Sequence, residues 1–288
     1  MIWINPARSR CPLSSFLRPL FHGQKESAMS ARSPRNVIPL RMDTRAMSCL
    51  GCEARAACLP AGMDDETCAR IDSLVLQRYR LLRGEGLYQM NEAVRGRVYA
   101  VRSGHFKCYR LTPDGDQRIT GLPGRGTLLG LDVLGCERHA SAASATADSV
   151  LCELSHPRLL EAARRFPALE RRLEQMLSQE LARQHGLAVM LSYPRAEQKI
   201  ACYLLQLAWS SRHLEAGRVC VDLPLTRQDI GDYLGLTDAT ITRQLLRLQR
   251  EGVLRVERRH IVLTDQPGLQ RMADGESGAP EAAHTAQR

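Results

Sequence analysis

One segment near the C-terminus limits the fold of this chain more than any other. Residues 225–263 have the sequence LTRQDIGDYLGLTDATITRQLLRLQREGVLRVERRHIVL. Thr226 and Thr237 stand where helix N-caps are expected, and Gly235 and Gly252 stand where the two helices would end. Two short helices joined across a glycine turn form a helix-turn-helix, which is the first structural prediction.

The second helix of this pair has two faces of different character. Apolar residues recur at helical spacing on one face, which is expected to pack on the first helix: Ile241, Leu245 and Leu248. Three residues lie together on the opposite face, near the start of the helix, where a recognition helix meets base edges: Ala239, Thr242 and Arg243. Arg243 is the predicted base reader, because its planar fork fits guanine O6 and N7 with about 1–3 kcal/mol of discrimination.

Positive charge and a predicted hairpin accompany the same helix. Six arginines lie between residues 243 and 259 against Glu251 and Glu257, which favours contact with phosphates. The segments 253–256 and 260–263 have strand character and predict a small wing. A solvated basic helix would explain the charge, but not the caps, turn, stripe and wing together. The segment therefore predicts binding to double-stranded DNA, with three further candidate contacts: Thr226, Thr237 and Arg247.

The bulk composition agrees with a DNA-binding protein of about two domains. The chain has 288 residues, is 44% hydrophobic and carries a formal net charge of +9, which fits an anionic partner. Part of this excess lies in residues 1–46, which are expected to be a disordered or over-extended basic leader. No run approaches the roughly 18–20 apolar residues of a membrane span, and no secretory signal is evident, so we expect a cytoplasmic protein without a membrane partner.

Three of the ten cysteines lie within ten residues, at C-x2-C-x5-C spacing: Cys49, Cys52 and Cys58. A short loop of this kind can hold three corners of an iron–sulfur cluster, and a fourth thiolate must then come from elsewhere in the fold. Zinc is the rival metal, although structural zinc sites more often use two C-x2-C pairs and only one is present. Without a signal peptide, reduced thiols or metal ligands are favoured over disulfides.

The region after this loop changes from helical to strand-like texture. Residues 63–80 have helical spacing, whereas residues 83–157 contain short alternating segments separated by glycines. Pro113–Gly115 predicts a hairpin turn between two of these segments. Such a pattern favours a small antiparallel β-barrel or jelly roll, and therefore an α+β chain. A barrel of this sort can hold a cyclic nucleotide, for which Arg138 and Ser141 are weak candidate phosphate contacts.

A long helical pattern covers residues 167–193. Its apolar stripe advances in steps of four and three residues, as in a coiled coil, and predicts a dimerisation surface: Leu173, Leu177, Leu181, Gln184, Ala188 and Leu191. A two-fold dimer would place two recognition helices about 34–36 Å apart on a near-palindromic site. The alternative is a stripe that packs only on its own barrel. The next helix, expected over 195–212, should turn Trp209 inward, and residues 266–288 are expected to be a disordered tail.

These features define five expected regions in a fixed order. They are the basic leader, a cluster loop with β-barrel sensor domain, a dimerisation helix, a winged helix-turn-helix domain and the tail: 1–46, 47–166, 167–193, 194–265 and 266–288. Residues 49 to about 265 resemble the Crp/Fnr family, specifically its Fnr branch of oxygen-responsive regulators. The motifs that carry the resemblance are the cysteine loop, VRSG, PDGDQRITG, VLCELS and TRQDIGDYLGLT.

The resemblance implies a fourth ligand, Cys152 in SVLCELS, for which Cys136 is the only close competitor. It further implies a four-iron, four-sulfur cluster held by Cys49, Cys52, Cys58 and Cys152. Oxygen would destroy that cluster and return a DNA-binding homodimer to weakly binding monomers. An activator of this family would also contact RNA polymerase. One departure stands out, because the family's reading helix usually carries Glu where this chain has Ala239.

Two other interpretations compete with this one. A regulator of the same fold could answer a cyclic nucleotide, a haem-bound gas such as nitric oxide, or thiol oxidation, with structural zinc or no metal. An iron–sulfur redox enzyme or electron carrier would leave the basic helix-turn-helix unexplained, and no nucleophile, acid–base pair or nucleotide-binding glycine loop appears in the sequence. We therefore expect a protein that is not an enzyme.

Overall fold

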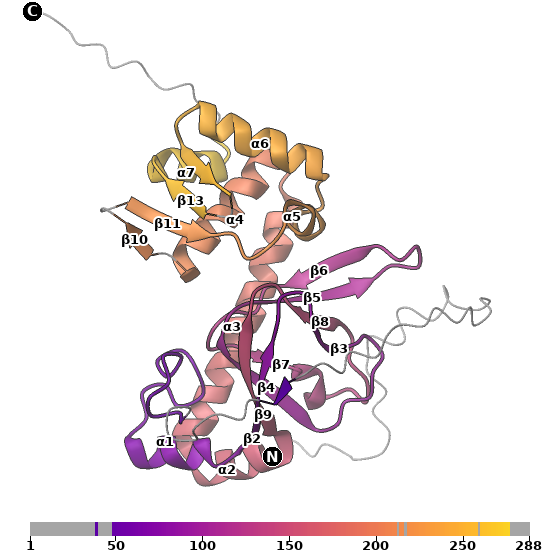
Figure 1. Cartoon of the computed structure of the whole chain (residues 1–288), viewed down its shortest axis with the longest axis vertical. Coiled ribbons are helices and arrows are strands. Elements are labelled where there is room, and N and C mark those ends of the chain that lie inside the picture. Colours follow the sequence, from indigo (N-terminus) through magenta and orange to yellow (C-terminus); the bar gives the residue numbers. More distant parts are fainter. Residues whose placement is uncertain (1–37, 40–47, 212, 216–217, 259, 277–288) are drawn as a thin grey trace, which may run out of the picture. The chain divides into compact units, whose positions relative to one another are not determined.

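A computed structural model describes most of the chain: residues 38–39, 48–211, 213–215, 218–258 and 260–276. The chain divides into two compact units, Met1–Leu181 and Ala182–Arg288. The boundary falls inside the long helix α3 (Pro167–Ser192), which is coloured in the middle of the scale in Figure 1. The expected leader 1–46 lies outside the described residues, except for Ile38 and Pro39, which form strand β1.

Two antiparallel sheets make up most of the first unit. One sheet has the order β1 (Ile38–Pro39), β2 (Val75–Leu81), β9 (Ser149–Ser155), β4 (Arg97–Ser103) and β7 (Leu128–Leu129). The other has the order β3 (Gly86–Tyr88), β8 (Ala142–Ala145), β5 (Phe106–Leu111) and β6 (Gln117–Gly121). The predicted hairpin turn at Pro113–Gly115 is confirmed between β5 and β6. The predicted antiparallel β-sheet domain is therefore confirmed. In the described part of the chain it consists of two separately hydrogen-bonded sheets and not of one closed barrel.

The inner faces of the two sheets share one apolar core. It contains buried side chains from both sheets: Leu81, Val101, Leu129 and Leu151 from the first, and Tyr88, Phe106, Ala143 and Ala145 from the second. The ring of Tyr88 also stacks on that of His139, with centroids 3.9 Å apart. Side chains therefore fill the space between the sheets.

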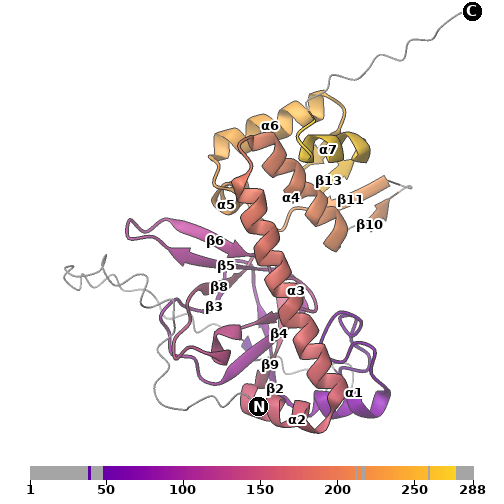
Figure 2. The ribbon, with the colours of Figure 1, turned by 180° about the vertical axis from the view of Figure 1, so that it is seen from behind.

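Helices cover the outer face of the first sheet. Residues of α1 (Asp65–Asp72), α2 (His156–Arg165) and the first half of α3 bury apolar side chains against β4 and β9 in a second core. Figure 2 shows the first half of α3 running along this sheet. A short 3-10 helix, η3 (Leu131–Leu134), follows β7.

The prediction of helical structure over residues 63–80 is wrong in its second half. Helix α1 ends at Asp72, and Val75–Leu81 instead forms β2. This strand pairs with β9 through most of its length, so tertiary pairing overrides the local helical spacing.

The second unit combines five helical segments with a four-stranded sheet. Its helices are the end of α3, α4 (Ala196–Ser211), α5 (Arg227–Leu234), α6 (Asp238–Arg250) and α7 (Gln266–Ala273). The antiparallel sheet has the order β10 (His213–Glu215), β11 (Arg218–Asp222), β13 (His260–Leu263) and β12 (Leu254–Glu257). The expected winged helix-turn-helix is therefore confirmed, with α5 and α6 as its helices and β12–β13 as its wing.

The local signals for this motif act as the sequence predicts. Thr226 accepts a hydrogen bond from the Asp229 amide in a reciprocal capping box, and Thr237 accepts one from the Thr240 amide. Gly235 ends α5 with φ 66°, a left-handed conformation that glycine adopts without strain. The apolar stripe of α6 is buried, and its members are Ile241, Leu245 and Leu248. Ile230 and Leu234 of α5 are buried as well.

Two expectations for the second unit are wrong. Residues 266–273, placed in the disordered tail, form α7, which Asp265 caps and which buries Leu269 next to α4. The capping Asp followed by Pro267 was the available signal for this helix. Trp209 of α4 is 87% exposed instead of facing inward. No helix among the described residues is long and apolar enough to cross a membrane.

The turn between α5 and α6 depends on a close backbone approach at Gly231. A Cβ atom at this position would lie 2.5 Å from the carbonyl oxygen of Leu236. We expect Gly231→Ala to lower the stability of the second unit by about 1–3 kcal/mol, because backbone must move to admit the methyl group. The midpoint of thermal unfolding, followed by circular dichroism, measures the effect.

Gly186→Ala in α3 is the matched control, because a Cβ there meets nothing within 4 Å. Alanine is favoured over glycine inside a helix by about 0.5–1 kcal/mol, so this change should stabilise the protein slightly. Equal melting behaviour of the two variants would contradict the proposed close contact.

Candidate thiol pocket and DNA-binding face

Four cysteines from two distant segments line one pocket in the first unit. Cys49, Cys52 and Cys58 come from the loop before α1, and Cys152 comes from the middle of β9. The unfilled space of the pocket, including its open mouth, is about 400 Å³. Apolar side chains and two arginines complete its lining: Ala54, Leu59, Pro60, Ile71, Val75, Ala100, Leu154, Arg55 and Arg102. Cys136, the competing candidate ligand, is absent from this lining.

Backbone turns and an acidic anchor shape the cysteine loop. The amide of Cys52 donates to the Cys49 carbonyl at 3.3 Å, and the amide of Cys58 donates to the Ala54 carbonyl at 2.9 Å. The Cys49 amide also donates to Asp72 Oδ1 at 3.0 Å, and the same oxygen accepts from Arg78 Nη2 at 2.5 Å. The loop is therefore tied to the end of α1 and to β2. This anchoring role of Asp72 could not be predicted from the sequence, because no local pattern distinguishes Asp72 from other acidic residues at helix ends.

Cys152 occupies a fixed position between two neighbouring strands. It lies opposite Arg78 of β2 and Ala100 of β4, and it is 7% exposed. Burial raises the pKa of the Cys152 thiol, and the guanidinium groups of Arg78 and Arg102 oppose that rise. Strand β9 thus presents this thiol to the loop, and the neutral thiol is favoured because burial outweighs the nearby positive charge.

Burial favours the neutral form of two loop thiols as well. It raises the pKa of Cys58 to about 12, against the opposing effect of the Leu59 backbone hydrogen bond. The pKa of Cys49 is also raised, first by burial and then by a hydrogen bond between its thiol and the Asp72 carboxylate. Metal ligation requires thiolates, so any metal bound here would displace protons from these thiols.

The described residues contain no preformed site for a single metal ion. No group of three or more His, Cys, Asp or Glu side chains in this part of the chain is arranged to hold one ion. The four thiols line one pocket, and a tetrahedral zinc ion bound there would need every sulfur at about 2.3 Å.

The outward face of α6 carries the candidate base-reading residues. Ala239 and Arg243 are exposed, and Thr242 is half-buried. The Thr242 hydroxyl accepts a hydrogen bond from Arg227 Nη1 of α5 at 3.2 Å. Arg227 therefore stands beside the reading face, although the sequence reasoning did not identify it as a contact. The sequence feature that could have identified Arg227 is its position directly after the Thr226 cap, at the start of a helix that packs on α6.

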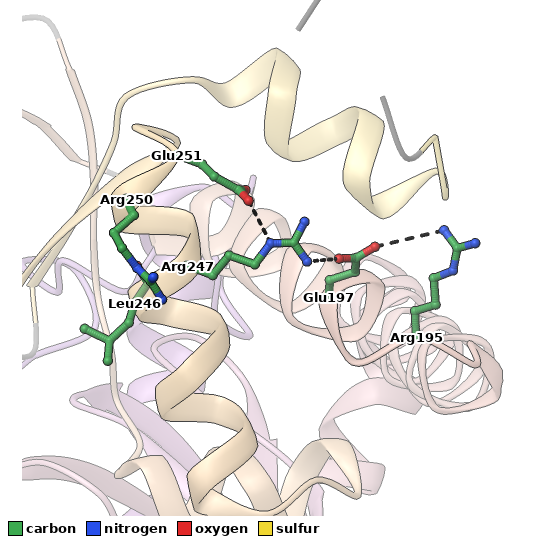
Figure 3. Close-up of polar contacts among 6 residues, drawn as sticks. All are labelled: Arg195, Glu197, Leu246, Arg247, Arg250 and Glu251. Atoms are coloured by element: carbon green, nitrogen blue, oxygen red, sulfur yellow. Dashed lines mark hydrogen bonds and ion pairs between the residues drawn. The ribbon is translucent and has the colours of Figure 1, made fainter. Parts of the chain in front are cut away.

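Arg247 is held by carboxylates on two helices (Figure 3). Its Nη1 lies 2.7 Å from Glu197 Oε2 at the start of α4, and its Nε lies 2.7 Å from Glu251 Oε1. Arg195 extends this group, with Nη1 4.0 Å from Glu197 Oε1. The guanidinium of Arg247 is thus largely neutralised within its own unit. Its expected DNA contact stays a prediction, and a weaker one than that of Arg243.

The apolar stripe of α3 is largely exposed in the single chain. Leu177, Leu181 and Leu191 are 38%, 58% and 40% exposed, and Gln184 and Ala188 are exposed as well. Leu173 differs, because it is half-buried against the core of its own unit. The stripe from residue 177 onward is therefore an exposed apolar surface on which a partner helix stays a prediction, whereas Leu173 packs mainly on the first unit.

Comparisons with known proteins match both units. The Crp-like helix-turn-helix domain matches residues 198–272, and the cyclic nucleotide-binding domain matches residues 78–166. The transcriptional regulatory protein btr of Bordetella pertussis (strain Tohama I) is 34% identical over 242 residues, which cover 83% of this chain and 98% of that protein. The fumarate and nitrate reduction regulatory protein of Escherichia coli (strain K12) is 30% identical over 230 residues, which cover 79% and 91%.

Solved structures show the same architecture. FixK2 from Bradyrhizobium japonicum superposes with a TM-score of 0.61 at 29% identity, covering 70% of this chain and 98% of that one. A CRP/FNR-family transcriptional regulator from Thermus thermophilus superposes with a TM-score of 0.55 at 27% identity, covering 68% and 98%.

Proposed function

Because the chain belongs to the Crp/Fnr family of DNA-binding transcriptional regulators, which are not enzymes, we propose that it controls transcription in response to oxygen. A four-iron, four-sulfur cluster would be the sensor, and Cys49, Cys52, Cys58 and Cys152 would be its ligands. With the cluster bound, two chains would pair along α3 and grip a near-palindromic site. The observation that carries this proposal is the single pocket lined by all four cysteines.

The chemistry of the pocket suits an iron–sulfur cluster. Such clusters are usually held by four cysteine thiolates, whereas structural zinc sites more often use two C-x2-C pairs and the loop has only one. Arg102 lines the same pocket, and its positive charge would offset part of the negative charge of four thiolates. When bound, such a cluster supplies a centre that oxygen degrades. The protein itself supplies the ligands, the apolar walls and the compensating charge.

A cyclic nucleotide receives less support as the signal, although the family of the sensor domain is named for it. Arg138, the candidate phosphate contact, is exposed and donates to the Asn91 carbonyl at 2.7 Å. The space between the sheets is filled by buried side chains such as Tyr88 and Phe106. No anion-binding arrangement is evident among these residues, whereas four cysteines line one pocket.

Sequence recognition is assigned to the outward face of α6. Arg243 would read guanine, Thr242 would lie beside it, and the Ala239 methyl could touch a thymine methyl where family members present a glutamate. Phosphate contacts from the cap residues Thr226 and Thr237 would fix the register of the helix. Transcription activation would further require contact with RNA polymerase.

The cluster proposal predicts a visible, oxygen-sensitive chromophore. Protein purified without oxygen should be brown, contain about four irons per chain, and lose colour, dimer and DNA affinity together on exposure to air. Absorption spectra, iron and sulfide analysis and analytical ultracentrifugation measure these changes. Cys152→Ser should lose the cluster, and Cys136→Ser, outside the pocket, should keep it. Colourless protein with stoichiometric zinc would refute the oxygen-sensing proposal while leaving the DNA-binding function intact.

If Arg243 reads a base, its replacement should reduce the preference for the cognate DNA site more than the affinity for DNA in general. Arg243→Ala should lower the preference for the cognate site by about 1–3 kcal/mol, or roughly 5- to 150-fold. Competition binding against random DNA at fixed salt measures this preference. Arg271→Ala is the control, because it removes one arginine from α7 in the same unit. If both variants lost preference equally, net charge and not base reading would explain the effect.

A further inference from the structure

An arginine of α3 reaches back to the cysteine loop. Arg172 Nε donates to the carbonyl oxygen of Cys58 at 3.0 Å, and Arg172 Nη2 donates to that of Ala57 at 2.5 Å. Two donors of one rigid guanidinium thus hold two consecutive carbonyl groups of a segment more than 100 residues earlier in the chain. Charge-assisted bonds of this kind are stronger than neutral ones.

The same loop segment is confined on another side by the sheet domain. Gly126, in the turn before β7, has φ 86°, and a Cβ atom there would lie 2.5 Å from Ala57 Cβ. Arg125, next to it, forms an ion pair with Glu53 at 3.6 Å. The peptide between Ala57 and Cys58 is therefore packed against the β6–β7 turn and bonded to α3. A shift of Cys58 would alter both contacts.

We propose that Arg172 is the positioning residue that couples occupancy of the thiol pocket to α3. This inference rests on the proposed function, in which Cys58 is a ligand. A ligated Cys58 would hold its own carbonyl and that of Ala57 where Arg172 bonds them, which fixes the first turns of α3. Release of Cys58 would free the loop and remove both acceptors from the guanidinium.

The position of Arg172 in α3 explains why its anchorage matters for pairing. Leu173 follows it and packs on the core of the sensor domain, and the exposed stripe begins one turn later at Leu177. A helix rotated or loosened at Arg172 would present that stripe differently to a second chain. Because linkage is reciprocal, pairing of two chains would equally favour the gathered arrangement of the cysteine loop.

The test is a comparison of dimerisation with and without the cluster in full-length protein. In wild type we expect cluster loading to tighten the dimer by about 5- to 150-fold, the usual range of such coupling. Arg172→Gln should keep its iron and its absorption spectrum, but the ratio of the two dimer dissociation constants should fall to about twofold or less. Arg172→Lys should recover only part of the coupling, because an ammonium group cannot present the same two-pronged geometry.

Arg171→Gln is the matched control, since Arg171 is an exposed neighbour on the same helix. Its coupling ratio should equal that of wild type. An unchanged ratio in Arg172→Gln with full iron content would overturn the inference but leave the oxygen-sensing proposal standing. If the wild-type protein bound no iron, or if its dimer were equally strong with and without the cluster, the proposed function itself would be contradicted.

A second measurement covers the case in which Arg172→Gln does not hold a cluster. Hydrogen exchange of wild-type protein should then show residues 49–58 and the first turns of α3 becoming protected together on cluster loading. Protection of the loop without any change in α3 would overturn the coupling role of Arg172.

Discussion

The first unit depends on one long-range arrangement, in which the cysteine loop lies in one pocket with the middle of β9. Three independent anchors keep the loop there: Asp72 bonds its first amide, Arg172 bonds its last carbonyls, and Gly126 admits Ala57 at close range. Each anchor comes from a different element. The pocket is therefore a property of the folded unit and not of the cysteine motif, which alone could bind many metals in many geometries.

The same arrangement explains how a small chemical event can have a large structural effect. The loop buries Ala54 and Leu59, and Cys58 is one of the partly buried residues that pack on the core between the sheet and α3. A few kcal/mol of ligand bonding at such a position can shift a two-state equilibrium by orders of magnitude. In the proposed dimer, the exposed stripe of α3 would link that equilibrium to pairing, because covering its apolar surface with a second chain is favourable.

Local signals in the sequence predicted the helix-turn-helix of the second unit, whereas the first unit was predictable only in outline. The caps at Thr226 and Thr237 act through residues three positions away, so sequence alone identifies them. The contact of Arg172 with the loop spans more than 100 residues and leaves no local pattern. Residues 75–81 illustrate the opposite failure, because strand pairing overrode a helical spacing that looked sufficient. Helix α7 was missed although its capping Asp265 was visible.

The structure also narrows how the reading helix can choose its site. Arg247 is bound by Glu197 and Glu251, and Ala239 has no polar atom in its side chain, so Arg243 is the strongest hydrogen-bond donor near the start of the outward face. Farther along the same face, Leu246 is 50% exposed. If Arg243 reads guanine as proposed, such a face would select bases through a single guanine contact and through thymine methyl groups. It would discriminate less sharply than a face that adds a glutamate, so pairing of two chains would contribute a larger share of the specificity.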